Sequence, residues 1–334
     1  MKHIIIGGNG FVGHRLALDL MERGEQVLVA DIARIGHALY RNVPFVRVDV
    51  TAPETLDAIP IEPGDMVYNM AAKMLAPLQV RAKRRDFFWP VNHGGPANIL
   101  AWMERKGARR MVQFTTDMVY GHSLPGLRQD EDHPMAPLGE YGASKQAAEQ
   151  VCEEYRAKGF DITIFRPRLI IGPGRLGILA KLFKLIDLNL PVPMIGSGAN
   201  PYQFISVYDC ASAAIAAWEA GCPNRAYNLG SEDPPPVKRL LGDLIRHAGS
   251  RSILIPTPGF AVKGALRLLD LANMPLMDPE QYLIADEFCL RETGRARSEL
   301  GWRPQHRDGD MLNAAYAEYR RSFDAGRSPA SVHA

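Results

Sequence analysis

The stretch Lys2-His3-Ile4-Ile5-Ile6-Gly7-Gly8-Asn9-Gly10-Phe11-Val12-Gly13 decides the fold of this chain. Its apolar run predicts a buried parallel strand, and its glycines form a turn that opens a helix. Glycines let the backbone approach a pyrophosphate, and the free N–H groups and the dipole of the helix N-terminus bind it. The stretch therefore predicts the first unit of a dinucleotide-binding α/β domain.

An acidic residue after the next apolar run indicates which dinucleotide is bound. Residues 26–30 read as a strand and Asp31 follows them. A carboxylate about 20 residues beyond the glycines accepts hydrogen bonds from the adenosine ribose, and its charge repels a 2′-phosphate. We therefore expect NAD as the cofactor and disfavour NADP, although Arg34 lies close enough downstream to keep that preference moderate.

Strand-like and helix-like segments alternate along the rest of the chain. Apolar runs at residues 45–50, 66–70, 110–115 and 162–166 follow the first two strands. This alternation predicts an α/β fold, a Rossmann-type doubly wound parallel sheet with right-handed crossovers. Ligands of such sheets bind outside the carboxyl ends of the strands.

Candidate cofactor contacts fall at those strand ends. Asp49 and Val50 could meet the adenine edge, and the small residues of Met70-Ala71-Ala72 leave room for the cofactor backbone. Thr115-Thr116-Asp117 ends a further strand. Asp49 could equally cap the turn before Thr51, so its role stays open.

A tyrosine and a lysine supply candidate acid–base chemistry. Tyr141 precedes Lys145 by four residues in a segment of good helix formers without proline, which places the phenol and the ammonium on one helix face. A cation held beside the phenol favours its ionised form and lowers its pKa toward the working pH. The spacing also occurs on ordinary surface helices, so its meaning depends on the cofactor motifs.

The composition is that of a globular enzyme. The 334 residues are 46% hydrophobic and carry a formal net charge of +2, which implies no nucleic-acid or membrane-surface partner. Polar residues interrupt the N-terminal segment, so we expect no secretion signal and a cytoplasmic location. The apolar stretch 260–277 is too short and too charged to span a membrane. The cysteines have no paired spacing, so neither a disulfide framework nor a metal site is expected.

Together these motifs resemble a known family. The residues that carry the resemblance are Gly7-x-x-Gly10-x-x-Gly13, Asp31, Asn69-Met70-Ala71-Ala72, Thr116 before Val119-Tyr120-Gly121, Tyr141-x-x-x-Lys145 and Glu299-Leu300-Gly301-Trp302. The chain resembles an extended short-chain dehydrogenase/reductase of the NAD-dependent epimerase/dehydratase type, similar to UDP-glucose/galactose 4-epimerases, over about residues 1–320. The resemblance implies a Rossmann domain at residues 1–167, to which a segment at about 203–232 returns, and a mainly substrate-binding domain at residues 168–330.

The resemblance also implies a role for each matching residue. Tyr141 is the general acid/base, Lys145 lowers its pKa and binds the nicotinamide ribose, and Thr116 hydrogen-bonds the substrate oxygen at the reacting carbon. The chemistry is hydride transfer between a secondary alcohol and C4 of the nicotinamide. The implied cofactor-binding residues are Gly7, Asn9, Gly10, Phe11, Val12, Gly13, Asp31, Ile32, Asp49, Val50, Met70, Ala71, Ala72, Tyr141, Lys145 and Pro167.

Two departures from the family pattern bear on the substrate. Met118 stands where sugar dehydratases carry a glutamate base, and a thioether cannot take up that proton, so dehydration is disfavoured. Tyr202 stands where an arginine usually clamps the substrate diphosphate, and an aromatic ring cannot supply that bidentate contact. The candidate substrate-binding residues are Lys73, Asp117, Met118, Arg168, Arg175 and Tyr202.

The sequence predicts an NAD-dependent enzyme that oxidises a secondary alcohol. The leading hypothesis is an epimerase that retains its NAD and acts on a nucleotide-sugar. The main alternative is a dehydrogenase or reductase of a sterol-like or acyl-chain substrate, because that branch also tolerates a missing diphosphate arginine. A non-catalytic NAD sensor is disfavoured, since the catalytic candidates are intact. The family commonly dimerises through the helix of Tyr141 and the one before it, so we expect a homodimer, with which the apolar Ile99, Leu100 and Trp102 are compatible.

Overall fold

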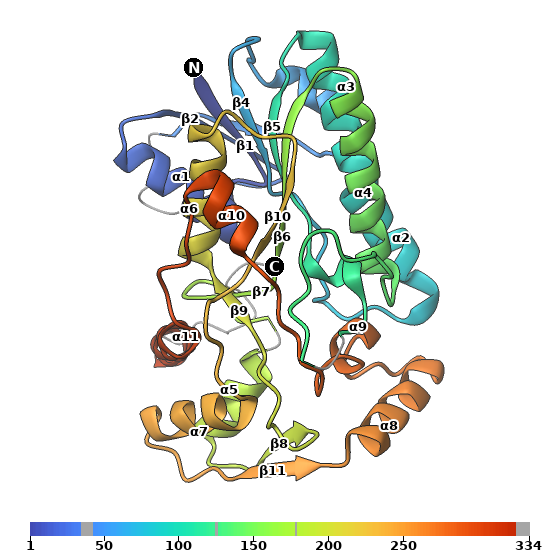
Figure 1. Cartoon of the computed structure of the whole chain (residues 1–334), viewed down its shortest axis with the longest axis vertical. Coiled ribbons are helices and arrows are strands. Elements are labelled where there is room, and N and C mark those ends of the chain that lie inside the picture. The colour runs from blue at the N-terminus through green and yellow to red at the C-terminus, as the bar shows by residue number, and fades with distance from the viewer. Residues whose placement is uncertain (35–42, 124–125, 178, 325–334) are drawn as a thin grey trace.

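A parallel sheet forms the centre of the larger part of the molecule (Figure 1). The computed structural model describes residues 1–34, 43–123, 126–177 and 179–324. Within these residues the sheet has seven strands, in the spatial order β10 (Ala226–Leu229), β6 (Asp161–Pro167), β5 (Arg110–Phe114), β4 (Met66–Asn69), β1 (Lys2–Ile6), β2 (Gln26–Asp31) and β3 (Phe45–Arg47). The predicted α/β fold with a parallel Rossmann-type sheet is confirmed.

The strand order places a ligand site at the middle of this sheet. From β1 the chain moves outward through β2 and β3, and it then returns to the other side of β1 with β4. At such a switch point the two following loops diverge and leave a crevice outside the carboxyl ends of the strands. The apolar residues Ile4, Ile5 and Ile6 hold β1 in the sheet interior with at most 1% of their surface exposed, which is typical of a strand covered on both faces.

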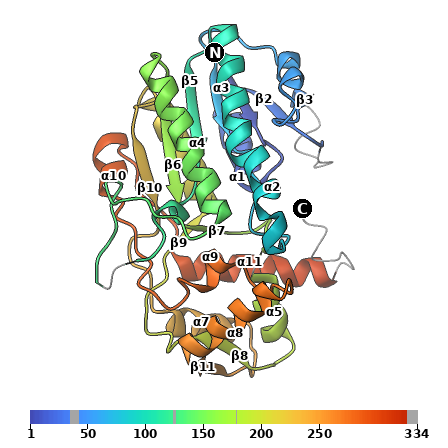
Figure 2. The ribbon, with the colours of Figure 1, turned by 90° about the vertical axis from the view of Figure 1, so that its right-hand side faces the viewer.

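Helices cover both faces of the sheet (Figure 2). The core on one face includes residues of α1 (Phe11–Glu22), α6 (Val207–Glu219) and α10 (Gly294–Leu300). The core on the other face includes residues of α3 (Gly95–Lys106) and α4 (Glu140–Ala157). Because α6 and β10 lie within residues 207–229, a late segment of the chain packs with the N-terminal sheet.

The remaining elements form a smaller part at the lower end of the molecule in Figure 1. Its strands form two parallel pairs, β7 (Leu169–Ile171) with β9 (Phe204–Ser206) and β8 (Val192–Ile195) with β11 (Leu254–Thr257). Its helices are α5 (Leu179–Asp187), α7 (Val237–His247), α8 (Gly259–Leu271), α9 (Pro279–Tyr282) and α11 (Asp308–Asp324). Residues 325–330 of the expected substrate domain lie outside the described residues.

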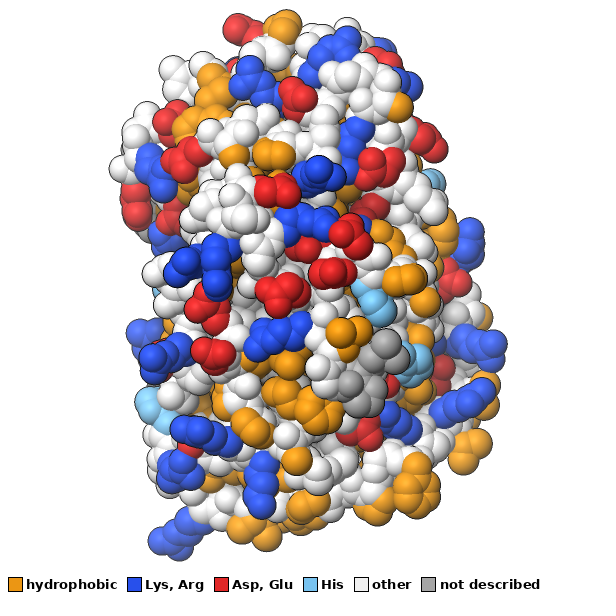
Figure 3. Space-filling model, viewed as in Figure 1, with side chains coloured by type: hydrophobic (Ala, Val, Ile, Leu, Met, Phe, Trp, Pro, Cys, Tyr) orange, Lys and Arg blue, Asp and Glu red, His pale blue; other side chains and the backbone are white. Residues whose placement is uncertain are grey.

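Helix α8 presents apolar side chains to solvent. Phe260 is 84% exposed and Leu268 is 70% exposed. Hydrophobic side chains gather at the lower end of the molecule in Figure 3, where Figure 1 places β8, β11 and α8. In the described part of the chain, every helix is too short or too polar to cross a membrane.

The apolar residues of α3 belong to the core of the single chain. Ile99, Leu100 and Trp102 have no exposed surface and pack with the residues of the sheet. Because these side chains face inward, they cannot supply the contacts of a dimer interface. The expected homodimer therefore rests on the family resemblance alone.

Candidate active site

The glycine turn between β1 and α1 brings two backbone segments into close contact. Gly7 has a φ of +78°, and a Cβ atom at this residue would lie 2.5 Å from the backbone nitrogen of Ala71. A Cβ atom at Gly13 would collide with the Gly7 carbonyl oxygen. Gly10 occupies the N-cap of α1, and no side chain caps this helix. The N–H groups of its first turn thus remain open to an anion, as a pyrophosphate site requires.

The carboxylate at the end of β2 is fixed against the glycine turn. Asp31 accepts hydrogen bonds from the backbone N–H of Asn9 at 2.9 Å and of Ile32 at 2.7 Å. The Asn9 side chain donates to the carbonyl of Ala33. Partial burial raises the pKa of Asp31, although these hydrogen bonds oppose the shift. The side chain is thus held at the edge of the turn where an adenosine ribose would bind.

The first-turn residues of α1 lie between the cofactor candidates and the loop that follows β7. The Phe11 ring lies against Gly172 and Gly174, in the loop that leads to Arg175. Val12 packs against the core beneath the sheet. Pro167 ends β6, beside Leu229 of β10. These residues lie at the carboxyl ends of the strands, as the Rossmann arrangement requires.

The end of β4 supports the catalytic helix. The Asn69 side chain accepts a hydrogen bond from the Ala71 N–H at 3.2 Å. In the next turn, Lys73 exchanges two backbone hydrogen bonds with the side chain of Asn92, which also contacts the Ser144 hydroxyl at 3.2 Å. Asn92 lies in a π-helical turn, Pro90–Gly94, a feature that often marks functional sites. Met70 and Ala72 complete this strand end.

Asp49 caps a local turn. Its carboxylate accepts hydrogen bonds from the Thr51 N–H at 2.9 Å and the Thr51 hydroxyl at 2.7 Å. The hydroxyl bond lowers the pKa of Asp49. Val50 is buried and packs against Gly95: a Cβ atom added at Gly95 would lie 2.9 Å from the Val50 side chain. These contacts account for both residues without a ligand, in line with the capping alternative.

Three predicted catalytic residues come together at the start of α4. Thr116 follows β5, and its hydroxyl acts on the phenol of Tyr141 so as to lower the pKa of that phenol. Lys145 lies one turn further along α4 and donates from Nζ to the Phe114 carbonyl at 3.2 Å. Tyr141 is 3% exposed and Lys145 is 2% exposed. Two further contacts of the phenol, with Met74 Sδ at 3.6 Å and with the Phe88 ring, were not predicted.

Burial dominates the ionisation of this site. Desolvation raises the pKa of Tyr141, and the neighbouring Thr116 hydroxyl only partly opposes this shift. This direction is opposite to the one expected from Lys145 alone. Burial also lowers the pKa of Lys145 to about 8, against the influence of Glu149. An uncharged phenol can donate a proton.

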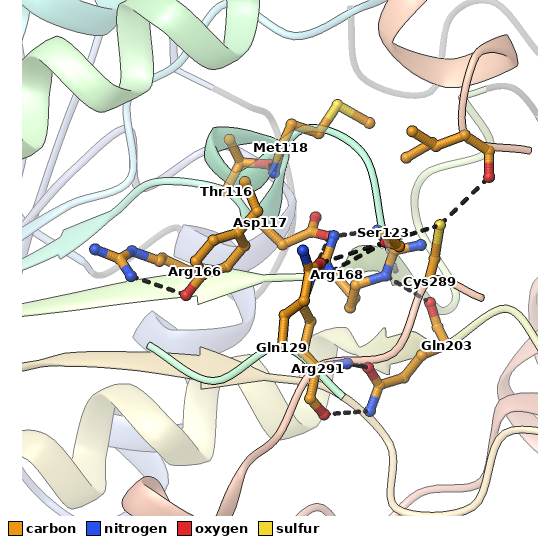
Figure 4. Close-up of polar contacts among 12 residues, drawn as sticks. Thr116, Asp117, Met118, Ser123, Gln129, Arg166, Arg168, Gln203, Cys289 and Arg291 are labelled. Atoms are coloured by element: carbon orange, nitrogen blue, oxygen red, sulfur yellow. Dashed lines mark hydrogen bonds and ion pairs between the residues drawn. The ribbon is translucent and has the colours of Figure 1, made fainter. Parts of the chain in front are cut away.

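Residue Asp117 joins two buried arginines (Figure 4). Its carboxylate pairs with Arg168 and, at 2.9 Å, with Arg291. Both guanidinium side chains have no exposed surface. The Tyr202 ring faces Arg168 at 4.6 Å from the guanidinium carbon. Two cations therefore share one carboxylate, and the Asp117 side chain, which we predicted to contact substrate, is the centre of a buried ion cluster.

Other arginines near the site are also paired. Arg166 binds Glu149 through several hydrogen bonds of 2.6 to 3.1 Å, and Arg295 pairs with Asp132 at 2.6 Å. Arg175 differs from them, since no hydrogen bond or ion pair connects it to another described residue. It is half-buried, and its charge acts on the phenol of Tyr141. Among these arginines, Arg175 is the one whose charge is not matched by an acid of the described chain.

Two candidate substrate residues face different surroundings. Lys73 is exposed, and its ammonium lies 5.4 Å from the centre of the Phe87 ring. Met118 is partly buried and packs with Leu75, Phe88 and Tyr141. Met118 therefore contributes an apolar wall beside the phenol. Within the described ranges, no group of three His, Cys, Asp or Glu side chains could hold a metal ion.

Glu280 is a residue of the site that the sequence did not suggest. It lies on α9, and its carboxylate accepts hydrogen bonds from the backbone N–H groups of Tyr141 and Gly142. No motif surrounds it, and 139 residues separate it from Tyr141. No local sequence pattern records this contact, because it depends on how a distant segment folds back onto the start of α4.

Comparisons with known proteins agree with this geometry. The model of the NAD dependent epimerase/dehydratase family matches residues 3–230. The "uncharacterized protein y4nG" of Sinorhizobium fredii is 30% identical, over 99% of this chain and 82% of that protein. A 2-alkyl-3-oxoalkanoate reductase of Stenotrophomonas maltophilia is 26% identical, over 91% of this chain and 95% of that protein.

The fold is shared with solved enzymes. The crystal structure of UDP-glucose 4-epimerase from Thermus thermophilus in complex with NAD superposes with a TM-score of 0.73 over 96% of this chain and 99% of that chain, at 24% identity. This similarity shows the fold. Together with the match to the family model, it leads to one conclusion: the chain belongs to the NAD dependent epimerase/dehydratase family.

Proposed function

We propose that the protein is an NAD-dependent oxidoreductase that interconverts a ketone and a secondary alcohol. The observation that carries this proposal is the buried phenol of Tyr141, whose pKa the buried Thr116 hydroxyl lowers, at the strand ends beside the glycine turn. Two neighbouring hydroxyls can both contact the oxygen of a carbonyl group. The open N–H groups of α1, with Asp31 beside them, fit NAD.

The proposed reaction moves one hydride and one proton. When bound, the reduced nicotinamide supplies the hydride to the carbonyl carbon. Tyr141 gives its phenolic proton to the carbonyl oxygen, which becomes the hydroxyl of the product, and Thr116 orients that oxygen. The phenol then recovers a proton from solvent. Burial raises the pKa of the Tyr141 phenol, so the phenol holds the proton that the reduction transfers.

For the substrate we propose a ketone without a diphosphate and with a carboxylate near the reacting carbon. A diphosphate needs several charge-assisted contacts, and the internal ion pairs of Arg166, Arg168, Arg291 and Arg295 occupy the cations that could supply them. Arg175 remains close enough for its charge to act on the Tyr141 phenol, and one guanidinium can bind one carboxylate. The reductase from Stenotrophomonas maltophilia, whose name denotes a 3-oxo acid substrate, supports the same class.

A nucleotide-sugar epimerase is the second candidate, and Arg175 is again the observation that favours it. A guanidinium beside the reacting carbon could hold one phosphate or the uronate group of a sugar. In that case the enzyme would retain NAD through an oxidation and a reduction. This candidate requires that Arg175 alone compensate for the arginine that Tyr202 replaces.

A substrate panel distinguishes the two candidates. The protein is mixed either with NADH and a straight-chain 3-oxo acid or its methyl ester, or with NAD and UDP-glucose, and NADH absorbance and sugar identity are followed. We expect NADH consumption with the acid at a kcat/KM about 10–100 times that of the ester, because one charge-assisted contact contributes about 1.5–3 kcal/mol. In Arg175→Met, acid and ester should react alike. The reductase proposal would be overturned if UDP-glucose were converted to its epimer while neither the 3-oxo acid nor its ester caused oxidation of NADH.

A further inference from the structure

The helix that carries Tyr141 begins without a cap of its own. Helix α4 starts at Glu140, and its N-cap residue is Gly139, which has no side chain to accept a hydrogen bond. The backbone N–H groups of the first helical turn have no partners within a helix. In most helices a Ser, Thr, Asp or Asn at the N-cap accepts one of these bonds. The catalytic tyrosine, at the second position of α4, therefore lies in a turn that local sequence leaves unsupported.

A carboxylate from the C-terminal part of the chain accepts the hydrogen bonds that a capping side chain would otherwise accept. Glu280 Oε1 accepts from the Tyr141 N–H at 2.8 Å, and Oε2 accepts from the Gly142 N–H at 2.9 Å. The whole residue is only 3% exposed. A carboxylate that accepts two N–H groups at a helix N-terminus gains from both the charge-assisted hydrogen bonds and the helix dipole.

The glycines at the start of α4 are fitted to this carboxylate. A Cβ atom at Gly139 would lie 2.6 Å from Glu280 Oε1, and one at Gly142 would lie 2.7 Å from Oε2. Any larger residue at either position would displace the Glu280 side chain. The two glycines and the glutamate therefore form one complementary unit, although 138 residues separate Gly142 from Glu280.

Glu280 is itself anchored to the Rossmann part of the molecule. Asp278 caps α9 by accepting the Glu280 N–H at 3.0 Å. Arg84, at the start of α2 (Arg84–Trp89), pairs with Asp270 of α8 and lies 3.4 Å from Asp278. Both ribbon views place α9 beneath the lower end of α4 (Figures 1 and 2). This ion pair holds the segment that delivers Glu280 to the start of α4.

We propose that Glu280 is a positioning residue for Tyr141, and that its carboxylate fixes the first turn of α4 so that the phenol meets the substrate oxygen. The inference rests on the proposed acid–base role of Tyr141. The charge of Glu280 also acts on the phenol and helps to raise its pKa, so that the proton stays on Tyr141 until transfer. The two N–H groups and Arg84 favour the charged carboxylate of Glu280, against burial and the neighbouring Asp278, which raise its pKa.

Hydrogen exchange tests the structural half of this proposal without any substrate. In Glu280→Ala, the amide protons of residues 140–143 should exchange at least about 10 times faster than in the wild type, because the first turn loses two acceptors. The matched control is Glu140→Gln, which removes a carboxylate on the same turn that contacts the Trp89 indole instead of these N–H groups. It should leave their exchange unchanged.

Steady-state kinetics test the functional half. Glu280→Ala should lower kcat by about 10–100-fold, since a shift of about 1 Å in a catalytic group has effects of this size, while KM and the Kd for NADH stay within about twofold. Glu280→Gln keeps one acceptor oxygen and should recover part of kcat. It also carries the test if the alanine variant fails to fold. Wild-type kcat and exchange in these variants, or equal losses in Glu140→Gln, would overturn the inference.

A parallel Tyr141→Phe variant separates this inference from the proposed function. If that variant turns over like the wild type, the acid–base role of Tyr141 fails, whatever Glu280 does. If it is inactive and Glu280→Ala is fully active, only the positioning role fails.

Discussion

Replacement of Asp117 by asparagine tests whether this residue is an ion partner within the fold or a contact of the substrate. Asp117 is 2% exposed, and it is the shared partner of Arg168 and Arg291, whose side chains have no exposed surface. Asparagine has nearly the same shape but no charge. The substitution therefore leaves two buried guanidinium groups without their counter-charge.

The expected loss of stability follows from this arrangement. Removal of one partner from a buried ion pair costs about 3–5 kcal/mol, because the remaining charge stays desolvated. Unfolding entropy is about 2.1 cal/mol/K per residue, and the chain has 334 residues. The melting temperature should therefore fall by about 4–7 °C. Arg291→Met should cost less than Asp117→Asn, because it leaves a neutral pair of Asp117 and Arg168.

Thermal and urea unfolding of the purified variants measure this difference. The matched control is Asp57→Asn, which also removes a carboxylate between two cations, Arg105 and Lys106, but at the exposed surface. Its melting temperature should stay close to that of the wild type. A loss below about 1 kcal/mol in Asp117→Asn, together with a large rise in substrate KM, would refute the reasoning and place Asp117 in the substrate site.

Three further predictions concern the same site. Burial lowers the pKa of Lys145 from 10.5 to about 8, so between these pH values the folded state binds fewer protons than the unfolded state. The contribution of Lys145 to the free energy of unfolding should therefore rise with pH in that window. The stability of Lys145→Met relative to the wild type should accordingly be higher at pH 7 than at pH 10. If the ammonium form holds the nicotinamide ribose, kcat/KM should fall as the pH rises through about 8, and a flat profile would exclude that role. Asp31→Ala should weaken NADH binding by about 10–100-fold in fluorescence titrations, since the ribose loses a charged acceptor. The variant should also discriminate less between NADH and NADPH. An unchanged ratio of the two affinities would show that another residue sets the preference for NADH.

Local patterns explain why the cofactor half of the molecule could be predicted. Gly7, Gly10 and Gly13 lie in one short segment that joins β1 to α1, and Asp31 ends the next strand. The close approach of Gly7 to Ala71 requires glycine, so the glycine in the sequence is itself a sign of that contact. The alternation of apolar runs similarly specifies a parallel sheet.

Contacts between distant segments could not be predicted in the same way. Asp117 and Arg291 are 174 residues apart, and Glu280 is 139 residues from Tyr141. No periodicity relates such pairs, since their meeting depends on how the C-terminal elements fold back on the sheet. For the same reason the sequence suggested Arg168 as a substrate contact, whereas the structure places it in a buried ion cluster.

Burial also changed the expected chemistry of the site. The spacing of Tyr141 and Lys145 suggested a phenol with a lowered pKa, but the structure buries both side chains almost completely. Desolvation disfavours the charged form of each group. The pKa of the phenol therefore rises and that of the ammonium falls, an outcome that depends on packing around α4 and not on the spacing of two residues.

Single-turnover oxidation of NADH tests the central claim most directly. Wild type and Tyr141→Phe are mixed with NADH and the 3-oxo acid, and NADH absorbance is followed in a stopped-flow instrument, with the Kd for NADH measured separately by fluorescence. We expect a slower reaction by at least about 100-fold in the variant, because general acid catalysis contributes about 10²–10⁴-fold, with an unchanged Kd for NADH. Oxidation of NADH by the variant at the wild-type rate would contradict the assignment of Tyr141 as the proton donor.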